Sequence, residues 1–417
     1  MNRYDSYQET DFEWIGTIPK HWGLSRAGKF FSERSDKVDD ITYPPLSVTM
    51  SGVVDQLADV AKTNDSDNRK LVQKGDFVIN SRSDRKGSSG ISPRDGSVSL
   101  INIVLNPRDI DPKFIQHLFK SYYFKEEYFR HGKGICWDLW TTRWDQFKNI
   151  NIPVPSLKEQ KRISGYLGMK AGQIDVVIEK MQKKIELLKE TRISLISQCV
   201  TKGLDPNVKM KNSDVEWIGE MPANWDAIRS RFMFNNKSEK NFLNEPLLSV
   251  TQRDGVVIRS EFDMRVWNPT ADVSGYKLID PGDFVISLRS FEGGIELSKV
   301  RGIVSPAYTI LETYKDIDHH YFWWLMKSHQ FIIELNRHVT GIRQGKNIIW
   351  DDFSNIHLTI PSMGEQKRIS SHLDKKARQI DRLIEKIEKK ISLLSEYRQS
   401  LISSVVTGKI KVTEEMI

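Results

Sequence analysis

The stretch Gly341-Ile-Arg-Gln-Gly-Lys-Asn347 is the part of the chain that most resembles a chemical motif. In a phosphate-binding loop, glycine backbone and a lysine cradle phosphates, and a serine or threonine binds magnesium. Here three residues separate the glycines where such a loop has four, and Asn347 stands at the magnesium-binding position. The motif is therefore rejected. Glycine-rich dinucleotide fingerprints are also absent, and we expect no catalytic residue, no metal site and no cofactor in this chain.

The bulk properties also favour recognition over catalysis. The 417 residues are too many for one core, and the net charge of +7 with a pI near 9.0 is compatible with a polyanionic partner. Cys136 and Cys199 lie far apart at non-equivalent positions, so they predict neither a zinc site nor a disulfide framework but a reducing cytosol. The N-terminus has no apolar signal region, and no apolar run approaches the ~18 residues of a membrane span. We expect a soluble, cytoplasmic protein with no membrane association.

The chain consists of two copies of one unit. Glu159-Gln-Lys-Arg-Ile-Ser164 returns as Glu365-Gln-Lys-Arg-Ile-Ser370, and Trp14-Ile-Gly…Trp22 returns as Trp217-Ile-Gly…Trp225. Such duplication predicts a repeated architecture with approximate two-fold symmetry. The predicted parts are globular blocks at residues 1–155 and 204–361, each followed by a long helix, at residues 156–203 and 362–417.

Each long helix begins with a predicted capping box, Ser156…Glu159 in the first and Ser362…Glu365 in the second. Apolar residues then alternate at spacings of four and three, which is the heptad pattern of a coiled coil. Glycines near the start of the first helix predict a kink or a break there. The seam residues are Ile174, Ile178, Met181, Ile185, Leu188, Leu195 in the first helix and Ile380, Ile384, Ile387, Ile391, Leu394, Leu401 in the second.

An exposed heptad seam needs a partner, and the other copy in the same chain is the nearest one. We expect the two helices to pair antiparallel, so that the blocks lie at opposite ends of a rod ~60 Å long. Two alternatives remain open: the seam drives homodimerisation, or each helix packs on its own block.

The sequence of each block predicts an α+β fold. Leu46-Ser-Val-Thr49 and Gly75-Asp-Phe-Val-Ile79, with their repeats at Leu248 and Gly282, predict short strands, the latter introduced by Gly-Asp turns. Phe114–Phe119 and its repeat predict a buried helix.

The duplicated set of motifs resembles the specificity subunit of type I restriction-modification systems. The match rests on Trp14-Ile-Gly…Ile-Pro…Trp22, on Ile152-Pro-Val-Pro…Glu159-Gln, on the repeats of both, and on the paired heptad helices. It covers essentially the whole chain. The resemblance implies two α+β target recognition domains separated by an antiparallel pair of coiled-coil helices, with a pseudo-two-fold internal repeat.

The resemblance also implies partners. Each block would read half of a bipartite, asymmetric sequence in double-stranded DNA. The helices would set the gap between the half-sites and bind two methyltransferase subunits, which use S-adenosylmethionine to methylate adenine N6. Restriction subunits would bring translocation and cleavage driven by ATP, with magnesium. Two alternatives stay open: a specificity subunit of a complex with methyltransferases only, and a coiled-coil scaffold with no role on DNA.

Comparison of the two halves supplies candidate DNA contacts. Arg82 and Arg289 end equivalent strands, and a guanidinium can bridge the O6 and N7 atoms of guanine. A salt bridge inside each block is the alternative for both. The loops around Lys133 and Gln344 are basic and rich in glycine, which suits contact with a DNA groove or a plain surface loop. The full set of expected DNA contacts is Arg82, Ser83, Lys133, Arg143, Gln252, Arg253, Arg265, Arg289, Ser290, Arg343, Gln344 and Lys346.

Overall fold

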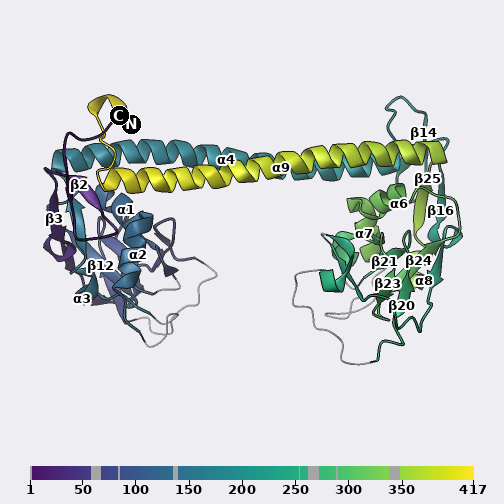
Figure 1. Cartoon of the computed structure of the whole chain (residues 1–417), viewed down its shortest axis with the longest axis horizontal. Helices are drawn as coiled ribbons and strands as arrows, with labels where there is room; N and C mark the ends of the chain where they lie inside the picture. The colour runs from purple at the N-terminus through teal and green to yellow at the C-terminus, as the bar shows by residue number, and fades with distance from the viewer. Residues whose placement is uncertain are drawn as a thin grey trace. The chain divides into compact units, whose positions relative to one another are not determined.

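Two long helices, α4 (Leu157–Lys202) and α9 (Met363–Val406), connect to two blocks of strands and short helices. The computed structural model describes residues 2–57, 67–82, 85–134, 140–252, 254–261, 272–287, 290–337 and 348–417. The chain divides into two compact units, Met1–Gln182 with Glu388–Ile417, and Lys183–Ile387. Each unit therefore contains one block and a segment of both long helices (Figure 1).

The first block is built on a four-stranded antiparallel sheet in the order β10-β9-β12-β4, with a three-stranded sheet in the order β11-β8-β5. Its last strand, β13, pairs with β3, which returns the chain to the start of the block before α4 begins. The elements are β1 (Tyr7–Glu9), β2 (Thr17–Pro19), β3 (Gly23–Arg26), β4 (Phe31–Glu33), β5 (Lys37–Val38), β6 (Leu46–Val48), β7 (Val53–Asp55), β8 (Arg69–Val72), β9 (Phe77–Asn80), β10 (Ser89–Ile91), β11 (Gly96–Ser99), β12 (Asn102–Pro107), α1 (Pro112–Lys120), α2 (Tyr122–Arg130), α3 (Trp144–Phe147) and β13 (Asn151–Val154).

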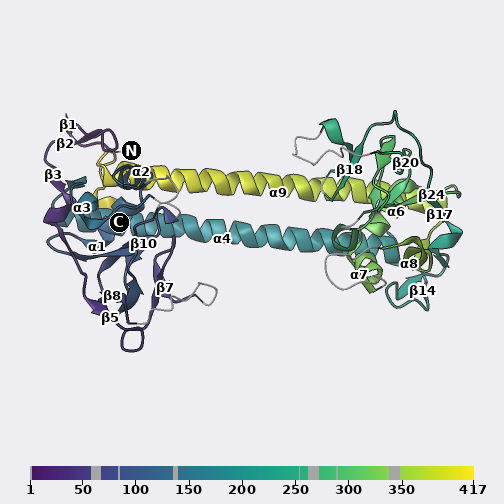
Figure 2. The same cartoon turned by 90° about the horizontal axis from the view of Figure 1, so that it is seen from below.

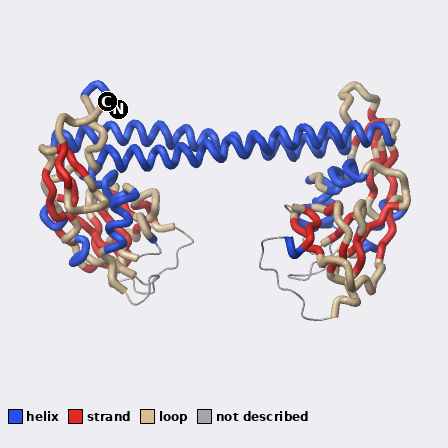
Figure 3. Tube along the Cα trace, viewed as in Figure 1, coloured by secondary structure: helices blue, strands red, loops and turns tan. Residues whose placement is uncertain are grey.

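The second block repeats this plan. Its four-stranded sheet has the order β22-β21-β24-β17, and the register is the same: Phe284 faces Leu311 as Phe77 faces Leu105. Figure 3 shows the strands of each block gathered together, with short helices beside them. The elements are β14 (Met210–Asn212), β15 (Glu220–Pro222), β16 (Asp226–Arg229), β17 (Phe234–Lys237), β18 (Leu248–Thr251), β19 (Gly255–Ile258), β20 (Lys277–Ile279), β21 (Phe284–Ile286), α5 (Ser290–Gly293), β22 (Glu296–Leu297), β23 (Gly302–Val304), β24 (Thr309–Thr313), α6 (His319–Met326), α7 (His329–Arg337), α8 (Trp350–Ser354) and β25 (His357–Ile360).

The predicted strands, Gly-Asp turns and buried helices are therefore confirmed. Gly75 and Gly282 precede β9 and β21 with φ of +93° and +98°, a conformation that glycine adopts without strain. Helices α1 and α6 carry the predicted apolar segments, and both begin at an aspartate side chain that accepts a hydrogen bond from the backbone, Asp111 from Phe114 N and Asp318 from Tyr321 N.

The apolar core of each block is completed by both long helices. In the first unit, Ile163 and Leu167 of α4 and Leu401 and Val405 of α9 are buried in one cluster with the residues of the sheet and of α1. In the second unit the helices exchange roles, so that the end of α4 and the start of α9 enter the core. Each block is thus closed by the helix that follows it and by the far end of the other helix.

The two helices run antiparallel in each unit, where they lie side by side (Figures 1 and 2). In the first unit, Lys158 at the start of α4 pairs with Glu414 beyond the end of α9, and Asp175 pairs with Arg398 at 2.8 Å. In the second unit, Arg192 pairs with Asp381 at 3.1 Å. The expected antiparallel pairing is confirmed within each unit.

The two ion pairs are images of each other under the sequence repeat. Arg192 is equivalent to Arg398, and Asp175 to Asp381, at a spacing of 206 residues. These arginines hold the seam positions that break the apolar pattern. All twelve predicted seam residues are buried or half-buried, whereas the charged residues around them are mostly exposed.

Two expectations about α4 were wrong. The helix runs unbroken through Gly165, Gly168 and Gly172, because the turns that contain them pack on the core of the first block through Ile163 and Leu167. Tertiary burial of this kind outweighs the ~1 kcal/mol that each glycine costs in an isolated helix.

The capping box of α4 is also only half formed. Ser156 Oγ accepts from Glu159 N at 3.3 Å, as predicted. The Glu159 carboxylate instead turns into the block, where it accepts hydrogen bonds from Tyr4 Oη at 2.7 Å and Trp22 Nε1 at 3.1 Å. This buried carboxylate fixes the N-terminal segment of the block to the helix.

The neighbouring glutamine makes the same junction in both units. Gln160 accepts from Asp111 N at 2.8 Å and donates to Pro155 O at 2.8 Å. Gln366 accepts from Asp318 N at 2.9 Å and donates to Pro361 O at 3.0 Å. The repeated Glu-Gln motif is therefore a structural joint between helix and block.

The two blocks differ in one contact that their helices α1 and α6 make with the long helices. His117 of α1 stands where α6 has Trp324, whose Nε1 donates to Asp374 at 2.9 Å and whose ring lies 5.7 Å from Arg192. Burial, together with the charges of Arg398 and Lys120, lowers the pKa of His117 to about 4. His117 is therefore neutral near pH 7.

Within the described ranges, none of the helices is long and apolar enough to cross a bilayer.

The shared cores predict that a substitution in α9 destabilises the first block. Leu401→Ala removes a side chain that is 5% exposed in that core, and the free energy of unfolding should fall by ~2–5 kcal/mol. Hydrogen exchange should then rise in β9 and β12, although these strands lie about 300 residues away in sequence. The control is Leu393→Ala on the same helix, since Leu393 is 55% exposed and should change stability by less than ~0.5 kcal/mol. Unchanged exchange in the first block of the Leu401 variant would contradict the shared core.

Candidate nucleic-acid interface

Three predicted contact residues of the first block are brought together by backbone pairing. Arg82 follows β9 and forms an antiparallel bridge with Thr141, which forms another with Lys133. Lys133 N donates to Thr141 O at 2.9 Å, and Thr141 N donates to Lys133 O at 3.0 Å. Arg143 lies two residues beyond Thr141. The sequence predicted each cation separately, and the structure joins the three segments at one edge of the block.

These cations are presented to solvent. Arg82, Lys133 and Arg143 are all exposed, and none of them has an ion pair with a carboxylate within the part of the chain that the structure describes. Exposed cations on a fixed backbone suit contact with phosphates or base edges. The alternative of a salt bridge inside the block is wrong for Arg82 as far as the described residues go.

A cavity of about 490 Å³ lies beside these cations. Arg82 and Arg143 line it together with Asn102, Lys70 and Thr141. Lys70 forms an ion pair with Glu33 at 3.0 Å, so its charge is neutralised within the cavity wall.

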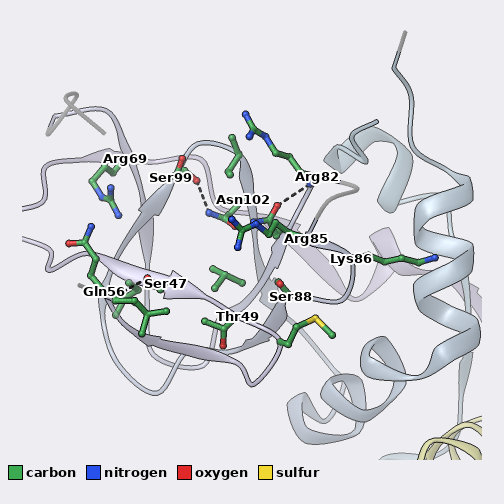
Figure 4. Close-up of a pocket in the computed structure, with 16 residues that line it drawn as sticks. Ser47, Thr49, Gln56, Arg69, Arg82, Arg85, Lys86, Ser88, Ser99 and Asn102 are labelled. Atoms are coloured by element: carbon green, nitrogen blue, oxygen red, sulfur yellow. Dashed lines mark hydrogen bonds between the residues drawn. The ribbon is translucent and has the colours of Figure 1, made fainter. Parts of the chain in front are cut away.

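A second cavity, of about 620 Å³, adjoins the same strand end, because Arg82, Ile101 and Asn102 line both. Figure 4 shows its polar rim. Several of its polar lining residues were not singled out from the sequence, among them Arg69, Arg85, Lys86 and Asn102. A comparison of the halves by strand register would have found two of them. Arg69 corresponds to Tyr276 and Asn102 to Tyr308, so these are positions where the two copies differ.

Most of the DNA contacts predicted for the second block lie outside the residues that the structure describes. Gln252 lies exposed after β18, with its Nε2 3.2 Å from Glu292 Oε2, and Ser290 begins α5. The predicted contacts that lie outside the described residues are Ser83, Arg253, Arg265, Arg289, Arg343, Gln344 and Lys346.

Other cations in the blocks are structural. Lys237 of β17 is buried between Asp280 and Asp283, at 2.6 and 3.0 Å. Burial opposes its charge, but the hydrogen bonds to both carboxylates raise the pKa of Lys237. Arg34 and Asp76 form the equivalent pair in the first block at 2.8 Å. These pairs fasten the strand of the sheet to the Gly-Asp turn, and they are not available to a ligand.

Comparisons with known proteins bear on this architecture. No protein-family profile matches the sequence. A relative from Methanocaldococcus jannaschii, described as the type I restriction enzyme MjaX specificity subunit, is 23% identical over 439 residues, which cover 97% of this chain and 98% of the relative. A second protein of that organism, the type I restriction enzyme MjaVIII specificity subunit, is 27% identical over 282 residues, covering 64% of this chain and 63% of the relative.

The chain is a homologue of type I specificity subunits. The family resemblance predicted from the repeated motifs is thereby confirmed.

Solved structures share the fold of this homologue. A chain from a study of complex assembly and conformational transition of the type I R-M system matches with a TM-score of 0.67 at 15% identity, over 94% of this chain and 99% of that one. The HsdS subunit from Thermoanaerobacter tengcongensis matches with a TM-score of 0.53 at 17% identity, over 94% and 98%. The predicted α+β fold class, with its long helices, is therefore confirmed.

The division between presented and structural cations can be tested by stability. Arg82→Ala, Lys133→Ala and Arg143→Ala should each change the free energy of unfolding by less than ~0.5 kcal/mol, because these side chains are exposed and make no ion pair among the described residues. Lys237→Ala should lower it by ~3–5 kcal/mol, since it leaves the buried carboxylate of Asp283 without its cation, whereas Asp280 keeps its ion pair with Arg301. Denaturant titration of the full chain measures both. A large loss of stability in any of the first three variants would show that its cation is part of the framework.

Proposed function

We propose that this chain is the DNA-recognition subunit of a type I restriction-modification complex. Each block reads one half of a bipartite, asymmetric target in double-stranded DNA, and the helix pair spaces the two half-sites. The observation that carries the proposal is one framework built twice with different side chains at equivalent positions, Arg69 against Tyr276 and Asn102 against Tyr308. Two copies of a reading surface that differ in this way suit two different half-sites.

The cationic edge of the first block supports contact with DNA. Phosphate contacts made by exposed lysine and arginine side chains supply affinity, and base-edge contacts supply sequence choice. Arg82, Lys133 and Arg143 have no carboxylate to neutralise them among the described residues, so their charge is available to phosphates.

The helix pair suits two copies of one partner. Leu187 and Leu393 occupy equivalent outer positions of α4 and α9 and are both 55% exposed, and Val177 and Leu383 form a second equivalent pair. Apolar side chains kept exposed at matched positions are typical of interaction surfaces. In this proposal two methyltransferase subunits bind there, one for each half-site, and restriction subunits join the complex.

The chemistry belongs to the partners in this proposal. The methyltransferase subunits use S-adenosylmethionine, and the restriction subunits use ATP and magnesium. This chain contributes recognition and spacing and has no catalytic residue of its own, and the complex works in the cytoplasm.

Mapping N6-methyladenine in DNA from cells that express the chain with its methyltransferase partner tests the proposal. The expected result is methylation confined to one motif of two short half-sites with a fixed gap. The triple variant Arg82→Ala, Lys133→Ala, Arg143→Ala should bind the target more weakly, and its log-log salt slope should fall by about one for each phosphate that the variant no longer neutralises. A methylation pattern without a gap, or no DNA binding by the chain with its partner at low salt, would favour a scaffold role instead.

The spacing role makes a separate prediction. Deleting one heptad from each helix at equivalent positions, 178–184 and 384–390, removes ~10 Å of helix while keeping the seam in phase. The methylated motif should keep both half-sites and have a shorter gap. Deleting residues 178–182 and 384–388 is the matched control, since a loss of five residues takes the seam out of phase and should prevent folding. A change of the half-sites at constant gap would refute the spacing role.

A further inference from the structure

The cavity of about 620 Å³ in the first block has a composition that direct groove reading does not explain. It lies between the β6–β7 hairpin, the residues that follow β9 and the turn from β11 to β12, as Figure 4 shows. Its volume falls within the ~300–1,000 Å³ of small-molecule sites. Base pairs stacked in a duplex present only their edges in the grooves, so they fill no recess of this kind.

The cavity is strongly cationic. Among the described residues, its lining includes Arg69, Arg82, Arg85 and Lys86 and no aspartate or glutamate. Lys86 has a partner outside the lining, Glu126 at 2.6 Å. A cavity lined in this way favours an anion.

Arg69 is the least expected of these cations, because it is only 6% exposed. Its Nε donates to Ser97 Oγ at 2.8 Å and its Nη2 donates to Ser97 O at 3.2 Å. Both acceptors are neutral, and burial lowers the pKa of Arg69, while the charge of Asp40 acts in the opposite direction. Burial of a guanidinium whose hydrogen bonds go to neutral acceptors is costly, and an anionic ligand in the cavity would offset part of that cost.

The remaining wall is apolar with a polar rim. Leu46, Val48, Leu57 and Ile101 supply flat apolar surface, and serine and threonine hydroxyls and the amides of Gln56 and Asn102 surround it. Asn102 is 5% exposed, and its Nδ2 donates to Ser99 O at 3.1 Å, while its Oδ1 accepts no hydrogen bond among the described residues. Apolar walls suit the faces of a planar base, and arginines suit a phosphate.

We propose that this cavity binds a single unpaired nucleotide, with its base between the apolar walls and its phosphate at the arginines. Two sources supply that chemistry: a nucleotide turned out of the target duplex, which rests on the proposed function, or a free mononucleotide, which does not. Turning a nucleotide out of a duplex costs a few kcal/mol, which the stacking and phosphate contacts of the cavity would offset. The second block has Tyr276 and Tyr308 where the cavity has Arg69 and Asn102, so the site belongs to the first block.

The test uses the full chain and the fluorescent base 2-aminopurine. In the duplex arm, the base replaces one nucleotide at a time in the half-site bound by the first block. In the free arm, 2-aminopurine deoxyribonucleoside monophosphate is titrated alone. The expected result is increased fluorescence at one duplex position, or saturable binding of the free nucleotide.

Matched variants assign the response to the cavity. Ser99→Phe places a ring in the cavity, and Leu57→Trp fills its mouth from a position that is 49% exposed. Both should reduce the response about tenfold or more. The control is Ser305→Phe, which makes the same change at the equivalent position after β23 and should leave the response unchanged. Circular dichroism melting of each variant confirms that it is folded.

The outcomes are distinct. A response that survives both filling variants, or no response in either arm, overturns the inference. A duplex response that both variants abolish supports it together with the proposed function. Binding of the free nucleotide that both variants abolish, with no retention of DNA, supports the cavity and refutes the proposed function.

Discussion

The structure depends on one constraint: neither block can bury its apolar core without segments of both long helices. The core of the first block includes Ile163 from the helix that follows it and Val405 from the helix of the other half. The second block uses the end of α4 and the start of α9 in the same way. The helices are therefore not linkers between finished domains, since each is part of two cores, and folding of the blocks is thermodynamically coupled to pairing of the helices.

Within the helix pair, stability and specificity have different sources. The apolar seam supplies burial, whereas the pairs Arg192–Asp381 and Arg398–Asp175 are half-exposed and contribute at most ~1 kcal/mol each. Their value lies in register. A slip of one heptad would leave each arginine at the seam without its aspartate, and polar seam residues are a well-attested means of excluding such alternatives. The repeat makes the pairing reciprocal, so a single arrangement satisfies both arginines.

The sequence predicted the parts whose causes are local or repeated. Heptad spacing predicted α4 and α9, and duplication predicted that their partner lies in the same chain. The sequence-based predictions failed where a residue distant in sequence determines the local structure. The local sequence predicts that Glu159 caps the helix. Its carboxylate instead accepts hydrogen bonds from Tyr4 and Trp22, which lie more than 130 residues away in sequence. The glycines of α4 predict a break, because the sequence does not show that the first block packs on this part of the helix.

The candidate interface shows the same division. Arg82, Lys133 and Arg143 were chosen by residue type, but nothing local reveals that Thr141 bridges their segments. Arg69 and Asn102 were not predicted individually. Their equivalence to Tyr276 and Tyr308 follows from the strand register, which cannot be derived from the sequence where the two halves diverge.

Under the proposed function, the separation of framework cations from surface cations allows one fold to serve two half-sites. The framework cations pair with buried carboxylates in both blocks, Arg34 with Asp76 and Lys237 with Asp283, and loss of either cation would leave a buried carboxylate without its partner. The exposed cations Arg82, Lys133 and Arg143 of the first block form no ion pair with a carboxylate among the described residues. Substitutions there are expected to have little effect on stability. Under the proposed function, sequence preference could therefore change while the sheet, the Gln160 and Gln366 joints and the helix pair stay constant. Arg69 is the exception, because it is buried and its hydrogen bonds go to the neutral Ser97, and the proposed nucleotide would give it an anionic partner in the cavity.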